Sequence, residues 1–131
     1  MWTQFMDMHS GGGSKEEWEY IYIEAPEEEA KVIFYNRFGH SADRVTCTCC
    51  GSDYSVSESE TLEEATAYER GCMYDKEQKK YIEAPDDTRH YRKYMSIDEY
   101  KQDKKIHVIA AEDIKQDERS GDVPEEGYVW V

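Results

Sequence analysis

The four cysteines constrain the fold of this chain more than any other feature of its sequence. Three of them lie in the run Cys47-Thr48-Cys49-Cys50-Gly51, and the fourth is Cys72. Two thiolates at Cys-x-x-Cys spacing can share one tetrahedral zinc ion, and the glycine lets the backbone turn around the sulfurs. We therefore predict a structural zinc ion in a zinc-ribbon-like cysteine turn. Its candidate donors are Cys47, Cys50 and Cys72, completed by either Cys49 or His40.

Other uses of these thiols stay open. Cys47 and Cys50 have the spacing of thiol-disulfide exchange proteins, so a redox enzyme is one alternative. In such enzymes the motif opens a helix, whereas Gly51-Ser52-Asp53 favours a turn here. A zinc enzyme is a second alternative, since a catalytic zinc keeps one position open for water. As a third, the cysteines can simply pack as small apolar groups.

Length and composition indicate one domain with a modest core. The chain has 131 residues, of which 38% are hydrophobic and 13% are aromatic. The aromatic side chains supply large contact areas that a chain of this size would otherwise lack. We predict a single domain over residues 1–131, with a flexible Gly/Ser segment at residues 10–14 within it. A structural zinc ion would add stability, because it closes several loops at once.

Strands and short helices are interspersed along the chain, which predicts an α+β protein with a small mixed sheet and two or three short helices. Ser/Thr-x-x-Glu capping boxes at Thr61 and Ser96 predict helices at about 61–70 and 97–102. β-branched and aromatic residues predict strands at 18–24, 32–35, 54–57, 81–83, 106–110 and 128–131. Single helical turns are expected at 27–31 and after Asp113, which with Gln116 is read as a cap.

The net charge of −14 is concentrated in three acidic blocks, residues 15–31, 51–70 and 106–131. Exposed carboxylates keep a protein soluble, and the same blocks can dock on a basic protein or imitate nucleic-acid phosphate. The candidate partner-binding residues are the acidic clusters inside these blocks: Glu27, Glu28, Glu29, Glu58, Glu60, Glu63, Glu64, Asp117 and Glu118.

Two classes of target are not expected. Direct binding to nucleic acid needs clustered basic residues, and the one basic cluster, Arg89-His90-Tyr91-Arg92-Lys93, is flanked by aspartates. Binding within a membrane is not expected either, because no apolar run approaches the roughly 18 residues that span a bilayer. With no signal-peptide pattern at its start, we expect the chain to be cytosolic.

Four segments support a family resemblance, and they are distributed from one end of the chain to the other: Met1-Trp2-Thr3-Gln4-Phe5, residues 32–40, Cys47-Thr48-Cys49-Cys50-Gly51 and Gly127-Tyr128-Val129-Trp130-Val131. In these segments the chain resembles a family of small, uncharacterised proteins encoded by bacteriophages. The resemblance brings no known activity. It implies a setting, the cytoplasm of an infected bacterium, where small acidic phage proteins often occupy basic, nucleic-acid-binding surfaces of host enzymes.

Together these observations predict a non-enzymatic acidic phage protein that binds and blocks a basic host or defence protein, acting as a nucleic-acid mimic. Tyr20, Tyr54 and Tyr68 are candidate exposed aromatic anchors beside the acidic clusters. One alternative is a thiol-redox or zinc-dependent enzyme centred on the cysteines. Another is a virion structural or assembly protein held together by the apolar terminal segments.

Overall fold

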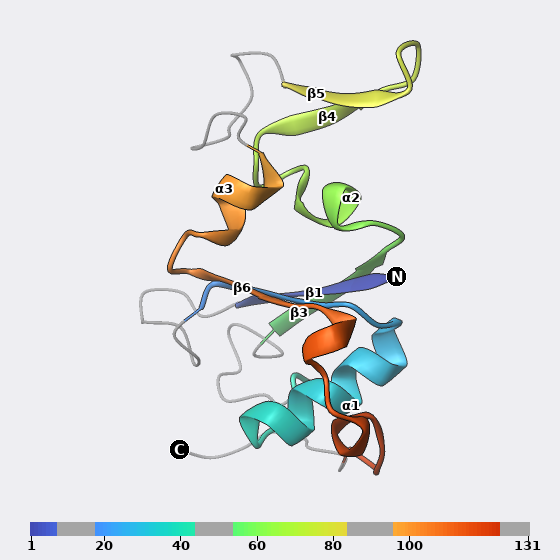
Figure 1. Ribbon diagram of the computed structural model, residues 1–131, viewed down its shortest axis with the longest axis vertical. Coiled ribbons are helices and arrows are strands. Elements are labelled where there is room, and N and C mark those ends of the chain that lie inside the picture. Colours follow the sequence, from blue (N-terminus) through green and yellow to red (C-terminus); the bar gives the residue numbers. More distant parts are fainter. Residues whose placement is uncertain (8–17, 44–53, 84–95, 124–131) are drawn as a thin grey trace.

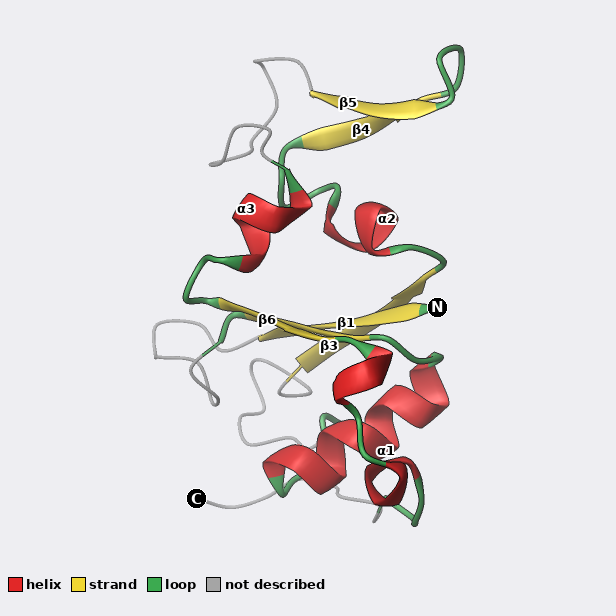
Figure 2. Cartoon of the chain, viewed as in Figure 1, coloured by secondary structure: helices red, strands yellow, loops and turns green. Residues whose placement is uncertain are grey.

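The computed structural model describes residues 1–7, 18–43, 54–83 and 96–123. In these ranges six strands in two sheets are interspersed with short helices, so the predicted α+β class is confirmed. Figure 2 shows the larger sheet in the middle, helices on both of its faces, and the smaller sheet at one end. None of the helices in these ranges has the length and apolar content that a bilayer crossing requires. The Gly/Ser segment 10–14 and the tail 128–131 lie outside the described residues.

The main sheet is built around the N-terminal strand. β1 (Trp2–Asp7) pairs antiparallel with both β2 (Tyr20–Ile23) and β3 (Tyr54–Ser59). β6 (Ile106–Ile109) runs parallel to β2, which gives the order β3-β1-β2-β6. The predicted strands at 18–24, 54–57 and 106–110 are thus confirmed, whereas β1 had not been predicted.

Helix α1 (Glu27–Phe38) covers one face of this sheet (Figure 1). Ala30, Ile33 and Phe34 are buried at the spacing that places side chains on one face of a helix. The ring of Phe34 stacks on that of Phe5 in β1, with 4.8 Å between the centroids. This contact anchors the helix to the central strand.

The predicted strand at residues 32–35 is wrong, because this segment lies inside α1. Val32 and Ile33 are β-branched, and local propensity alone favours a strand for them. In the fold, however, Ile33 is buried with its helical neighbours against the sheet, and this packing overrides propensity. The single turn expected at 27–31 therefore continues to Phe38, and Gly39 ends the helix with a left-handed φ of 83°.

Two short helices, α2 (Leu62–Thr66) and α3 (Ile97–Lys101), cover the opposite face of the sheet (Figure 1). Each begins at a predicted cap. The hydroxyls of Thr61 and Ser96 accept hydrogen bonds from backbone N–H groups of the first turn at 3.1 and 3.2 Å. Both capping predictions are confirmed, although α2 ends before the expected residue 70.

A hydrogen-bonded polar group lies between the sheet and these two helices. The hydroxyls of Tyr22 on β2 and Tyr100 on α3 are 2.9 Å apart, and both side chains are buried. Gln4 on β1 donates from Nε2 to the Tyr22 hydroxyl at 3.1 Å and to the carbonyl of Ala65 on α2 at 3.3 Å. Burial raises the pKa of both tyrosines, so the hydroxyls stay neutral at physiological pH. The network joins two strands and two helices.

The second sheet is a hairpin of β4 (Cys72–Asp75) and β5 (Lys80–Glu83), paired antiparallel. The strand predicted at 81–83 is thus confirmed. Figure 1 shows the hairpin beyond α2 and α3, on the side of the molecule away from α1. The N–H of Cys72 donates to the carbonyl of Ala67 at 2.8 Å, which ties the hairpin to the turn after α2.

The described chain ends in two short 3-10 helices, η1 (Ala111–Asp113) and η2 (Gln116–Arg119). Lys115 is the residue that precedes η2, whereas Asp113 closes η1. The expected cap at Asp113 is therefore wrong, although helical turns do form in this region. Both lie on the α1 side of the sheet.

We expect Tyr22→Phe to lower the free energy of unfolding by about 1–3 kcal/mol, because the half-buried amide of Gln4 and the buried hydroxyl of Tyr100 each lose a partner. Urea unfolding followed by circular dichroism measures this change. Tyr35→Phe is the matched control at a half-buried position on α1, and it should cost less than about 0.5 kcal/mol. Equal losses in the two variants would contradict a structural role for the network.

Candidate functional site

The predicted zinc donors fall into two groups. Cys47, Cys49 and Cys50 lie outside the described residues. Cys72 is buried at the start of β4, and its Sγ accepts a hydrogen bond from Nη1 of Arg70 at 3.4 Å. Within the described ranges, no group of three or more His, Cys, Asp or Glu side chains is arranged to hold a metal ion. The zinc-ribbon-like turn therefore stays a prediction.

His40, one of the two alternatives for the fourth donor, lies on the α1 side of the sheet. Its ring packs against Phe34 and Tyr54, with centroid distances of 5.6 and 6.4 Å. Cys72 lies on the other side of the sheet with α2 (Figure 1). The two candidate donors therefore lie on opposite faces of the sheet, which argues against a single ion shared by both.

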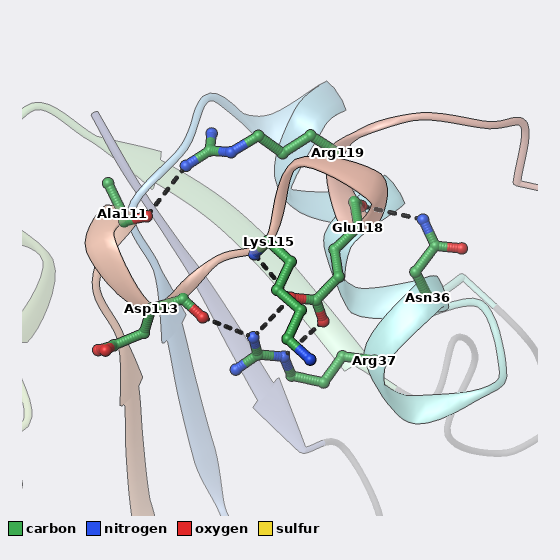
Figure 3. Close-up of polar contacts among 7 residues, drawn as sticks. All are labelled: Asn36, Arg37, Ala111, Asp113, Lys115, Glu118 and Arg119. Carbon is green, nitrogen blue, oxygen red and sulfur yellow. Dashed lines mark hydrogen bonds and ion pairs between the residues drawn. The ribbon is translucent and has the colours of Figure 1, made fainter.

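Two of the predicted partner-binding carboxylates form ion pairs inside the fold. Glu118 on η2 accepts two hydrogen bonds from Arg37 on α1, from Nε at 3.0 Å and from Nη2 at 2.8 Å. Glu29 on α1 pairs with Arg119 at 2.5 Å. Arg37 also donates to the carbonyl of Asp113 at 3.0 Å, and Figure 3 shows these contacts around Glu118. The pairs attach η1 and η2 to α1.

The charge of Glu118 is fixed by this arrangement. The Arg37 guanidinium holds the pKa of Glu118 at about 2, below its ordinary value of 4.5. The N–H of Lys115, which donates to Oε1 at 2.9 Å, lowers it further. The same pair raises the pKa of Arg37. Both side chains are therefore ionised at neutral pH and neutralise each other, so Glu118 contributes little to an external acidic field.

Five other predicted carboxylates are exposed, and we call them the acidic surface: Glu28, Glu58, Glu60, Glu63 and Glu64. None of the five forms an ion pair with any residue that the structure describes. Of the remaining candidates, Asp117 is exposed on η2 and Glu27 is half-buried on α1. Most of the predicted acidic residues thus keep an unneutralised charge at the surface.

The fold brings the start of α1 and the end of β3 together at the acidic surface. Oε2 of Glu58 accepts a hydrogen bond from the N–H of Glu27 at 2.7 Å. Pro26 precedes the helix and has no capping side chain, so Glu58 caps α1 from another strand. Pro26, Glu27, Glu28 and Glu58 line an open hollow of about 370 Å³. Sequence reasoning had named both acidic clusters, but their contact is long-range and leaves no local signal.

Of the three tyrosines predicted to be exposed anchors, one is exposed in the structure, and its role as an anchor stays a prediction. Tyr68 is 68% exposed, whereas Tyr54 is 2% exposed and packs against Phe34 in the core. Tyr54 was therefore wrong as an anchor, since its strand turns it toward α1. Tyr20 is half-buried.

Exposed aromatic and apolar side chains also occur on the β4–β5 hairpin, where sequence reasoning had placed no anchor. Tyr74 and Met73 are 48% and 46% exposed, and Tyr81 lies opposite Tyr74. Strand propensity predicts a strand at residues 81–83, but it does not predict that side chains of this strand and its partner are exposed. Their exposure follows from the position of the hairpin outside the main sheet.

His107 on β6 is half-buried, and its ring stacks on Trp18 with 4.2 Å between the centroids. Burial lowers the pKa of His107, and the charge of Arg37 lowers it further. The imidazole is therefore neutral at pH 7, and it packs as an uncharged ring against Trp18.

No protein-family model, no curated protein and no solved structure matches this chain. The resemblance to phage-encoded proteins consequently stays a prediction, and the site has to be interpreted from its own geometry.

We expect Glu118→Gln to destabilise the protein by about 1–3 kcal/mol at pH 7, because it breaks a doubly hydrogen-bonded ion pair. The folded pKa of Glu118 lies below its unfolded value, so its contribution is complete above about pH 5 and is lost as pH falls toward 2. Urea midpoints of the two proteins should therefore converge across that window.

The control is Glu112→Gln, an exposed carboxylate on η1 that forms no ion pair with the described residues. Its difference from the original protein should stay small at every pH. A Glu118 difference that is constant from neutral to acidic pH would contradict the assigned role of the Arg37 pair.

Proposed function

We propose that this chain is a non-enzymatic acidic protein that binds and blocks a basic protein of its host or of a host defence system. One observation carries the proposal: the structure uses Glu29 and Glu118 in ion pairs, yet leaves the five carboxylates of the acidic surface without a cationic partner among the described residues. Pairing them with cations inside the fold would lower their mutual repulsion, so carboxylates left unpaired at the surface favour an external cation as the partner.

The placement of these carboxylates supports recognition of an extended basic region. Glu58 lies near the end of β3 and Glu60 directly follows the strand. Glu63 and Glu64 lie in the first turn of α2, which comes next. Glu28, on α1, lines the same open hollow as Glu58. The resulting negative surface is drawn from three elements, and a nucleic-acid-binding surface has the complementary charge.

The resemblance to phage proteins supports the cytoplasm of an infected bacterium as the setting. There the acidic surface would compete with nucleic acid for a basic host or defence protein. Long-range attraction between opposite charges would speed the encounter and would weaken as salt screens it.

To test the proposal, affinity capture from a lysate of the bacterial host would identify the bound basic protein, and its affinity would be measured at increasing salt. We expect Glu28→Gln with Glu60→Gln to weaken binding about two- to ten-fold at low salt. The matched control, Glu112→Gln with Asp122→Asn, removes the same charge from exposed positions elsewhere and should bind nearly as tightly as the original protein. An affinity that is flat across the salt series, or equal in both variants, would overturn the proposal.

The structural zinc ion is part of the same proposal, as the element that shapes the cysteine turn. We expect about one zinc ion per chain in reduced, folded protein, bound by the thiolates of Cys47, Cys49, Cys50 and Cys72. Elemental analysis measures the ratio, and Cys47→Ser should lower both the zinc content and the melting temperature. Folded, reduced protein without stoichiometric metal would rule the site out.

A further inference from the structure

The β4–β5 hairpin carries a pair of aromatic rings at the surface of the molecule. Tyr74 and Tyr81 are directly opposite each other in the register, and their rings meet edge to face with 5.2 Å between centroids. Tyr74 is nearly half exposed. The hairpin lies beyond α2 and α3, away from the main sheet, so these rings do not belong to either hydrophobic core (Figure 1).

The hairpin is fixed to α2 by hydrogen bonds from Arg70. This side chain is 1% exposed, and it donates to Oγ1 of Thr66 at 2.9 Å, to the carbonyl of Glu63 at 3.2 Å and to Sγ of Cys72 at 3.4 Å. Side chains two apart on a strand lie on the same face, so Tyr74 shares the face of Cys72 that is directed toward α2. The rings are therefore held at the α2 end of the acidic surface.

Glu63 and Glu64 bring negative charge to these rings. Both are exposed in the first turn of α2, and neither forms an ion pair with a described residue. Arg70 binds both the carbonyl of Glu63 and Sγ of Cys72, so the first turn of α2 lies beside the start of β4. Burial raises the pKa of Tyr81, and the charges of Glu64 and Glu63 raise it further, which agrees with that placement.

We infer that Tyr74, Tyr81, Glu63 and Glu64 form the place where arginine side chains of the basic partner dock. The face of a tyrosine ring attracts a cation, and a flat guanidinium can stack on that face while its N–H groups bind a carboxylate. The charge of the carboxylate pair excludes an acidic occupant, and a purely apolar occupant would leave both carboxylates unused. This inference depends on the proposed function and adds to it the site and the preferred side chain.

The test measures binding of end-blocked oligo-arginine and oligo-lysine peptides of equal length to the full chain by calorimetry at low salt. We expect the arginine peptide to bind more tightly at equal charge. Tyr74→Ile with Tyr81→Ile removes both rings but puts β-branched strand formers in their place, and it should weaken arginine binding about two- to five-fold per ring and abolish the preference over lysine. Tyr74→Phe with Tyr81→Phe retains the rings and should preserve the preference.

A second pair of variants leaves the hairpin unchanged, so it tests the inference even if the hairpin fails to fold without its tyrosines. Glu63→Gln with Glu64→Gln should weaken arginine binding, whereas the charge-matched Glu112→Gln with Asp122→Asn should not. If the ring-free variant folds and binds as the original does, or if the two charge variants behave alike, the inference is overturned. Salt-sensitive capture weakened by Glu28→Gln with Glu60→Gln would then leave the proposed function standing. If the original protein binds neither peptide, the inference is likewise overturned, and the proposed function is decided by its own salt-dependent capture.

Discussion

The pairing of β1 with both β2 and β3 is the constraint on which the rest of the structure depends. Because side chains alternate along this strand, it presents Phe5 to α1 and Gln4 to the layer that contains α2 and α3. One face is closed by stacked aromatic rings, and the other by hydrogen bonds among Gln4, Tyr22 and Tyr100. A single strand thus fixes the positions of the helices on both sides, and with them the elements that carry the acidic surface.

Carboxylates serve two separate roles in this fold. Glu118 and Glu29 are matched by Arg37 and Arg119, which attaches the 3-10 helices to α1. Glu58 also has a structural role, since it caps the start of α1 while remaining exposed. The remaining carboxylates of the acidic surface are not neutralised within the described residues, and this division supports the proposed interaction function.

Local signals in the sequence predicted the elements that they control. The N-cap hydroxyls of Thr61 and Ser96 start α2 and α3, because a side-chain oxygen beside free N–H groups acts within one turn. Residues 32–35 show the limit of such signals. Their β-branched pair favours a strand, but burial of Ile33 and Phe34 against the sheet selects a helix. The site shows the same limit, since Tyr54 is aromatic and next to acidic residues but is directed into the core.

The sequence by itself determined the α+β class, the caps at Thr61 and Ser96 and the excess of negative charge, because these depend on residue type and on neighbours within a few positions. Only the tertiary structure decided which carboxylates are neutralised, that Glu58 meets the start of α1, and that the hairpin of Tyr74 and Tyr81 begins beside the turn of α2 that contains Glu63. The physical reason is the separation along the chain of the residues that interact. Strand pairing and helix packing join residues that are far apart in the chain, and no local pattern records which distant charge or ring will become a neighbour.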